Sequence, residues 1–199
     1  ELISPYADIW SIALDSSSCD LWLAYHDGSG NTTGFSNYDG NSFTHFSTPN
    51  GGDIFEVLPG TAGDIWVASS SNGLGHFDGD VWTWYNESNS PLSNYVTDIL
   101  FDHEGSLWVS TKNNGISVLN GGIWQTFNPS NSPVQEDILW LFIDHSGAVW
   151  AWNYGNPLRF DGTDWTPLYV NAGLEYDVIY SMAEDLNGKL WFGSYNAVY

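Results

Sequence analysis

The sequence predicts an all-β protein made of about five repeats of roughly 42 residues, each supplying one four-stranded sheet. Three observations support this prediction. An apolar residue followed by tryptophan recurs every 41 to 44 residues, and a Gly-containing turn signal follows the first four of these pairs. Between the turns lie runs of five to seven residues rich in Ile, Val, Leu, Phe and Trp, without an apolar pattern at helical spacing. Sheets repeated radially in this way form a β-propeller, which is the architecture we predict. The recurring tryptophans, called the anchor tryptophans below, are Trp22, Trp66, Trp108, Trp150 and Trp191.

Each repeat is expected to run through four strands in order. The first strand leads into an Asp-x-x-Gly turn, as at Asp102–Gly105, Asp144–Gly147 and Asp185–Gly188. In such a turn the Asp side chain bonds the backbone of its own turn and Gly supplies a positive φ. The second strand carries the anchor tryptophan, which we expect to be buried at equivalent positions of all five repeats.

The third strand leads into a second turn, and the fourth strand begins at the aromatic residue that follows. We expect a two-residue hairpin connection there, with a positive φ at both central residues. The dipeptides at this place are Asp39-Gly40, Asp78-Gly79, Asn120-Gly121 and Asp161-Gly162.

The repeats divide residues 1–199, taken as one domain, at about 6–50, 51–92, 93–134, 135–174 and 175–199. The fifth repeat stops within its third strand, so its sheet is expected to be incomplete. An open strand edge is normally covered in native proteins. Residues 1–6 folding back, a strand donated by another chain, or polypeptide outside this sequence are the three sources we consider, and strand donation would also give a homo-oligomer.

Charge excludes two classes of partner. The chain has 24 Asp and Glu against 3 Lys and Arg, a net charge of −21. Phosphate contacts need cations, so we expect no nucleic-acid binding, and anionic lipid is disfavoured for the same reason. No apolar run is long enough to cross a bilayer, so no membrane insertion is expected. Few lysines with abundant Asn, Ser, Thr and Gly favour an extracytoplasmic location: secreted, periplasmic or cell-surface.

The segments Asp102–Thr111 and Phe77–Trp82 resemble two-component regulator propeller repeats. This resemblance implies a large propeller from the extracytoplasmic part of a bacterial sensor, of which some respond to oligosaccharides. It covers nearly the whole chain and is specific for the repeat, whereas the biochemical role is not fixed by it.

Four of the twelve tryptophans exceed what the repeat uses, and two of them, Trp140 and Trp152, fall in the fourth repeat. Trp152 stands where other repeats have a small residue. Four positions before the turn Asp, with Pro59 taken as its stand-in in the second repeat, the repeats have Ser11, Phe55, Asp98, Trp140 and Ser181. These rings could be idiosyncratic packing between blades. Alternatively, they form an aromatic platform for a glycan or another small ligand, with polar contacts from Tyr154 and Arg159.

One loop suggests calcium. Asp27, Ser29 and Asn31 alternate as oxygen ligands do in calcium-binding loops, although the Gly and the bidentate Glu of such loops are missing. A flexible surface loop is the alternative, and no other cofactor is expected.

Catalytic chemistry is not indicated. His103 and His145 take the same position in successive repeats, and His26, His45 and His76 share no ligand spacing. The sequence therefore predicts a non-enzymatic extracytoplasmic module for ligand recognition or sensing. A structural or self-assembling surface or filament subunit is the main alternative, and a propeller lyase or hydrolase is a lesser one.

Overall fold

A computed structural model describes residues 8–26, 33–48, 52–61, 63–153, 155, 157–168, 179–194 and 198. The chain divides into two compact units, Glu1–Ile99 and Leu100–Tyr199, which are described separately here. The described residues contain strands and turns but no helix, and accordingly none that could cross a membrane.

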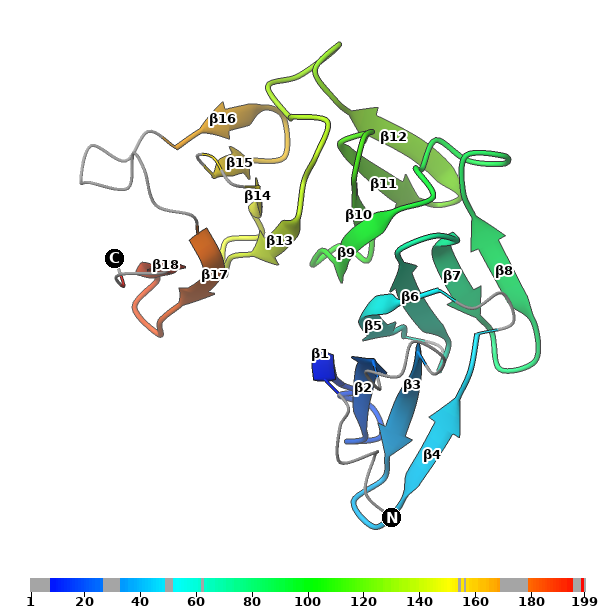
Figure 1. Cartoon of the computed structure of the whole chain (residues 1–199). Coiled ribbons are helices and arrows are strands. Elements are labelled where there is room, and N and C mark those ends of the chain that lie inside the picture. Colours follow the sequence, from blue (N-terminus) through cyan, green and yellow to red (C-terminus); the bar gives the residue numbers. More distant parts are fainter. Residues whose placement is uncertain are drawn as a thin grey trace. The chain divides into compact units, whose positions relative to one another are not determined.

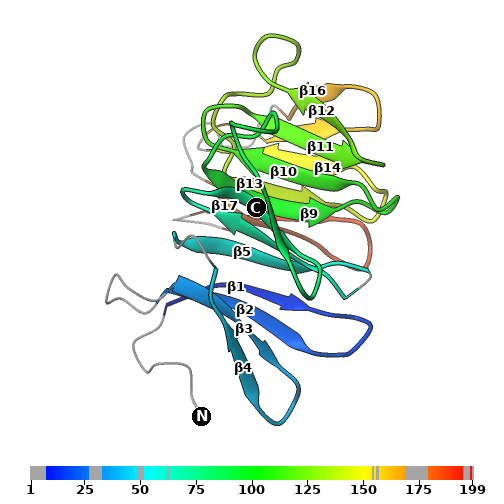
Figure 2. The ribbon, with the colours of Figure 1, turned by 90° about the vertical axis from the view of Figure 1, so that its right-hand side faces the viewer.

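The first unit holds two complete antiparallel sheets, which we call blades 1 and 2 (Figure 1). Each blade has its strands in chain order, and the blue strands of blade 1 fan out from β1 to β4 in Figure 2. Blade 1 consists of β1 (Asp8–Leu14), β2 (Leu21–His26), β3 (Thr33–Tyr38) and β4 (Phe43–Phe46). Blade 2 consists of β5 (Ile54–Pro59), β6 (Ile65–Ser69), β7 (Gly73–Phe77) and β8 (Trp82–Tyr85).

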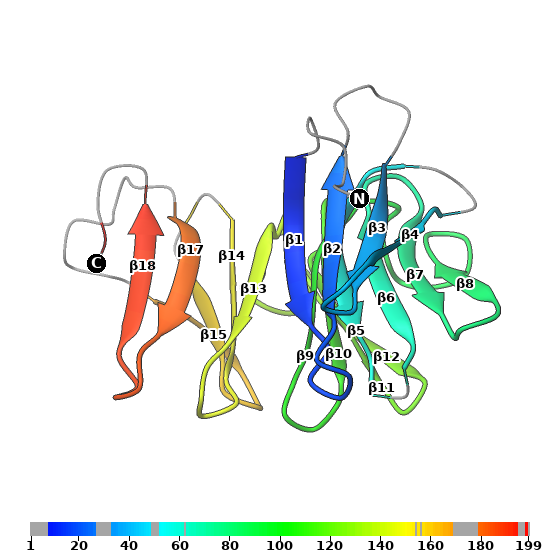
Figure 3. The same ribbon diagram turned by 90° about the horizontal axis from the view of Figure 1, so that it is seen from below.

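Blade 3 begins at the end of the first unit, and blades 4 and 5 follow in the second. Blade 3 consists of β9 (Val96–Phe101), β10 (Leu107–Thr111), β11 (Ile116–Asn120) and β12 (Ile123–Phe127). Blade 4 consists of β13 (Trp140–Ile143), β14 (Val149–Trp152), β15 (Leu158–Phe160) and β16 (Trp165–Pro167). In the described part of blade 5, β17 (Ile179–Glu184) and β18 (Leu190–Ser194) lie side by side (Figure 3). The predicted all-β propeller of five four-stranded blades with an incomplete last blade is confirmed.

Alternation along the strands builds the cores between blades. In blade 4, Val149 and Ala151 point toward blade 3 and pack with Trp108, whereas Trp150 and Trp152 point toward blade 5 and pack with Phe192. The second strand of a blade is therefore apolar on both faces. This is why Leu-Trp-Val-Ser-Thr and Val-Trp-Ala-Trp are buried throughout their lengths.

The expectation that all five anchor tryptophans are buried is wrong for two of them. Trp66, Trp108 and Trp150 are buried, but Trp22 is only half-buried and Trp191 is 39% exposed. The ring of Trp108 is covered by Phe160 and Trp165 of the next blade. Over the ring of Trp191 lies the Lys189 ammonium nitrogen instead, 4.2 Å from the ring centroid.

The second turn also differs from the prediction in three blades. Tyr38 pairs with Phe43, Phe77 with Trp82, and Phe160 with Trp165, so four residues rather than two connect these strands. In these loops the Asp carboxylate accepts backbone N–H groups, and only the Gly has a positive φ. In blade 3 two residues connect the strands as predicted, but they are Gly121 and Gly122, which both have a positive φ, and not Asn120-Gly121: Asn120 ends β11 and pairs with Ile123.

The comparison of the residues that stand four positions before the turn Asp needs one correction, at Phe55. Gly60 N donates to Asp64 O as Asp102 N donates to Ser106 O, so Gly60 and not Pro59 stands at the turn position of blade 2. A β-bulge at Phe55 then places Glu56 opposite Ala68, as Ser11 lies opposite Ala24. The residue equivalent to Ser11, Asp98, Trp140 and Ser181 is therefore Glu56.

The predicted pairing of the last strand falls mostly outside the described residues. Residues 1–6, 195–197 and 199 belong to the parts that the structure does not describe. Val198 forms an antiparallel bridge with Gly193, which places it beside β18 as a third strand would be.

Candidate functional site

The walls of the candidate site are shaped by one hydrogen bond that recurs from blade to blade. The indole Nε1 of Trp108 donates to Asp102 Oδ2 at 2.8 Å, and that of Trp150 donates to Asp144 Oδ2 at 2.8 Å. The other oxygen of each carboxylate accepts backbone N–H groups of the turn, such as Ser106 N on Asp102. Each turn is thereby tied to the centre of its blade.

Blade 5 has the same hydrogen bond, whereas in blade 2 the anchor tryptophan bonds an Asp at a different position. Trp191 Nε1 donates to Asp185 Oδ2, six residues earlier, at 3.1 Å. Trp66 Nε1 instead donates to Asp64, two residues earlier, and Asp64 also bonds His76 Nε2 at 2.7 Å. The turn of blade 2 has Gly60 where blade 3 has Asp102, so no Asp stands six residues before Trp66 and Asp64 supplies the acceptor instead.

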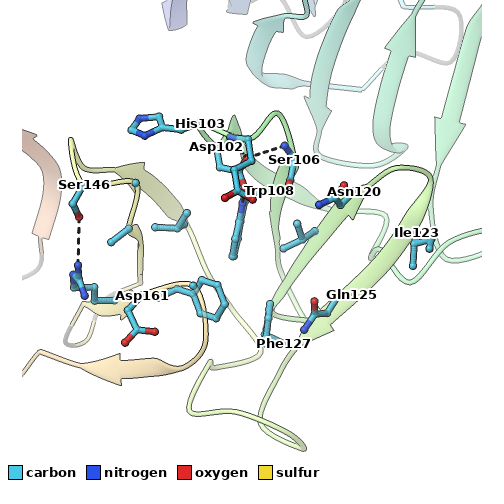
Figure 4. A pocket seen from close by; sticks show the side chains of 18 residues that line it. Asp102, His103, Ser106, Trp108, Asn120, Ile123, Gln125, Phe127, Ser146 and Asp161 are labelled. Carbon is cyan, nitrogen blue, oxygen red and sulfur yellow. Dashed lines mark hydrogen bonds between the residues drawn. The ribbon is translucent and has the colours of Figure 1, made fainter.

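A groove of about 750 Å³ lies between blades 3 and 4 in the second unit (Figure 4). Its floor is aromatic, formed by the half-buried rings of Phe127 and Phe160, which are in mutual contact and in contact with the buried ring of Trp108 at centroid distances of 5.3 to 6.2 Å. Its rim carries hydrogen-bonding side chains that Figure 4 shows around the opening. The polar and charged groups of the rim are Asp102, His103, Glu104, Asn120, Gln125, Ser146, Arg159 and Asp161.

Arg159 is the cation of this rim, and carboxylates hold it in place. Its Nε lies 3.9 Å from Asp144 Oδ2, its guanidinium donates to Ser146 Oγ at 3.5 Å, and its Cζ lies 5.8 Å from the Trp150 ring centroid. Backbone N–H groups of Asp164 and Thr163, with a smaller contribution from Arg159, lower the pKa of Asp161. Asp161 is therefore a carboxylate at neutral pH.

The predicted aromatic platform is wrong for Trp152. This ring is 3% exposed, packs between blades 4 and 5 and donates its Nε1 to Ile179 O at 3.1 Å. Trp140 is half-buried beside it, with ring centroids 6.0 Å apart. Arg159 lies opposite Trp150 and reaches the groove instead, and Tyr154 lies outside the described residues.

The calcium prediction cannot be placed, since Asp27, Ser29 and Asn31 all lie outside the described residues. Elsewhere in the described part of the chain, no three His, Cys, Asp or Glu side chains are grouped to hold a metal ion.

Two features of the site escaped the sequence reasoning although their signals were present. The Asp–Trp hydrogen bond has a constant separation of six residues in three repeats. A connecting motif, Asn-x-Ser-Asn-Ser-Pro, occurs at 86–91 and again at 128–133. In the second copy Asn131 Oδ1 accepts from Asn128 N, and Asn131 Nδ2 donates to Thr126 O, which closes the connection between blades 3 and 4.

Sequence comparison identifies the repeat. Residues 90–113 match the sequence model of the two component regulator propeller, which confirms the predicted repeat family at the junction between blades 2 and 3. No curated protein matches the chain.

Solved structures share the fold at low sequence identity. Virginiamycin B lyase from Staphylococcus aureus, in a complex with quinupristin, is 17% identical with a TM-score of 0.75, over 96% of this chain and 64% of that one. The extracellular domain of a putative hybrid two-component system from B. thetaiotaomicron is 21% identical with a TM-score of 0.73, over 99% and 28%. PorZ, a surface component of the type-IX secretion system of Porphyromonas gingivalis, is 21% identical with a TM-score of 0.75, over 96% and 32%. The chain thus spans less than two thirds of the length of each of these structures.

Proposed function

We propose that this chain is a non-enzymatic, extracytoplasmic propeller module that recognises a glycan in the groove between blades 3 and 4. The observation that carries the proposal is the combination of an aromatic floor with amide and carboxylate groups at the rim. Sugar rings offer apolar faces that stack on aromatic rings, and their hydroxyl groups bond to amides and carboxylates. The extracytoplasmic location is supported by the extracellular domain and the surface component among the similar structures.

The lowered pKa values of Asp144 and Asp161 favour ligand binding over general-acid catalysis. Hydrogen bonds from Ser146, Trp150 and Ala148 outweigh the effect of burial and lower the pKa of Asp144, and that of Asp161 is lowered by its own turn. A general acid at neutral pH needs the opposite shift. Asp161, at the rim, is suited to accept hydrogen bonds from a ligand, whereas Asp144 is 7% exposed, lies outside the groove lining and ties its turn to Trp150.

A glycan-array screen followed by calorimetric titration of the best glycan tests the proposal. Gln125 projects from β12 into the groove beside Val118, so Gln125→Ala is expected to weaken binding at least tenfold. Gln135→Ala is the matched control, because Gln135 is also exposed but lines a different hollow. The absence of any bound glycan, or equal binding by the Gln125 and Gln135 variants, would contradict the proposal.

Self-association is a second candidate function, supported by an exposed apolar face on blade 1. Ile12 is 63% exposed, Leu14 is 62% exposed, and the latter pairs with exposed Leu21 on the same face. Because repulsion at a net charge of −21 opposes association, the mass measured by light scattering should rise with salt concentration. A constant monomer mass from low to high salt would rule this function out.

A further inference from the structure

The rim of the groove between blades 3 and 4 carries an excess of negative charge. Asp102 and Glu104 belong to the turn between β9 and β10 on the blade 3 side, and Asp161 belongs to the loop between β15 and β16 on the blade 4 side. Figure 4 shows Asp102 and Asp161 on different blades of the opening. Arg159 is the one Lys or Arg among the described residues that line the groove. The rim thus has three carboxylates and one guanidinium.

The positive charge of Arg159 is already balanced within the protein. Its Nε lies 3.9 Å from Oδ2 of the buried Asp144. Its charge also helps to lower the pKa of Asp161, after the backbone N–H groups of that loop. A carboxylate or sulfate group on a ligand would have to compete with Asp144 for the guanidinium and would approach the other carboxylates of the rim. The groove therefore disfavours acidic ligands.

Glu104 is the rim carboxylate that the fold does not use. Its backbone N–H donates to Asp102, but within the described residues the Glu104 carboxylate makes no hydrogen bond or ion pair, and the side chain is exposed. The same turn position holds Ser146 in blade 4 and Asn187 in blade 5, so the turn itself does not require an acidic residue. The Glu104 carboxylate is therefore free to accept hydrogen bonds from a ligand.

We propose that the groove selects a glycan whose sugar rings carry unsubstituted, protonated amino groups. This inference rests on the proposed function and names the class of glycan. A protonated amino group donates charge-assisted hydrogen bonds to Glu104 and Asp161, and such bonds are roughly twice as strong as those between neutral groups. The apolar faces of the same sugar rings stack on Phe127 and Phe160, and these aromatic rings also attract ammonium groups.

The same groups set an order of affinity among glycans. Acetylation of the amino group keeps the sugar ring and its hydroxyl groups but removes the charge, so only neutral hydrogen bonds remain. A carboxylate or sulfate on the sugar brings a like charge to the rim. Affinity should therefore fall from the amino sugar to the acetylated sugar and again to the acidic sugar.

Calorimetric titration with chitohexaose and with its fully N-acetylated form tests the inference. At pH 6 the amino groups are protonated, and at about 0.15 M salt the Debye length is about 8 Å, so the net charge of −21 acts only weakly from a distance. We expect chitohexaose to bind at least tenfold more tightly than the acetylated form. Glu104→Gln should narrow this ratio at least threefold.

Glu136→Gln is the matched control, because Glu136 is exposed in the same unit but does not line the groove. It removes the same charge from the chain and should leave the ratio unchanged. Equal narrowing by both variants would show that net charge and not the groove attracts the amino sugar, which overturns the inference.

The inference and the proposed function can fail separately. Affinity for chitohexaose that is equal to or lower than that for the acetylated form overturns the inference alone, because the proposed function requires only that some glycan binds in the groove. A glycan array on which the folded protein binds nothing overturns both.

Discussion

The indole nitrogen of Trp108 and the carboxylate of Asp102 are joined by a 2.8 Å hydrogen bond that ties a surface turn to the core of blade 3. The Asp102 carboxylate bonds both the tryptophan and the turn, because its second oxygen accepts backbone N–H groups of the turn. The Asp-x-x-Gly motif and the anchor tryptophan are therefore one structural element and not two.

Replacing Trp108 by Ala should destabilise the protein strongly. The ring is 4% exposed and contacts aromatic rings of blade 4, so emptying its site should lower the free energy of unfolding by about 3–5 kcal/mol. Urea denaturation measures the change. Trp191→Ala removes the same side chain from an exposed place and should cost much less; equal losses would show that burial is not the cause.

Asp144 should contribute to stability against acid. Because its pKa in the folded state lies below the unfolded value of about 3.9, its contribution is present above that value and is lost as the pH falls through the folded-state pKa. Asp144→Asn should therefore flatten the loss of thermal stability between pH 5 and 3. If this variant lost thermal stability between pH 5 and 3 as the wild type does, the role given to Asp144 would be contradicted.

Glu56 should affect the pH dependence of stability in the opposite direction to Asp144. Its raised pKa means that the folded state holds a proton which the unfolded state releases between about pH 4.3 and 8, so stability falls as the pH rises through this range. Glu56→Gln should be more stable than the wild type at pH 9, by on the order of 2 kcal/mol after allowance for solvent screening of a half-buried group. The two proteins should melt alike near pH 4, and a stability difference that does not vary with pH would refute this.

The connection between blades 3 and 4 should depend on Asn131. Asn131→Ala removes two hydrogen bonds, at 3.0 and 2.8 Å, and should cost about 1–3 kcal/mol in urea denaturation. Asn187→Ala is a suitable control in an exposed turn, where the Asn187 backbone N–H bonds Asp185 and is retained on substitution. A smaller loss for Asn131 than for Asn187 would be unexpected.

The repeat length and the anchor tryptophans were predictable from the sequence, because each repeat packs its strands with the same residue types at the same positions. The site was less predictable because it depends on where repeats differ. Trp152 looked like a surface platform by its size, yet its neighbour across the blade junction, Ile179, accepts its N–H and covers it. The equivalence of Glu56 with Ser11 was hidden by a bulge, which shifts the count by one residue and leaves no mark in composition. The four-residue turns were not predicted for a similar reason, since the Asp-Gly dipeptide occurs in turns of both two and four residues.

In the described part of the chain, strands pair only with their neighbours in sequence, and this has a consequence for how such a protein changes over time. A blade closes on itself within about forty residues, and the Asp–Trp bond of blades 2 to 5 lies within that span, so a blade needs adjacent blades only for side-chain packing. Duplication or loss of one period of sequence therefore leaves the register of every remaining sheet intact. Chains of this kind can lengthen or shorten by whole blades, while single substitutions on inner strands and groove rims alter what each copy recognises.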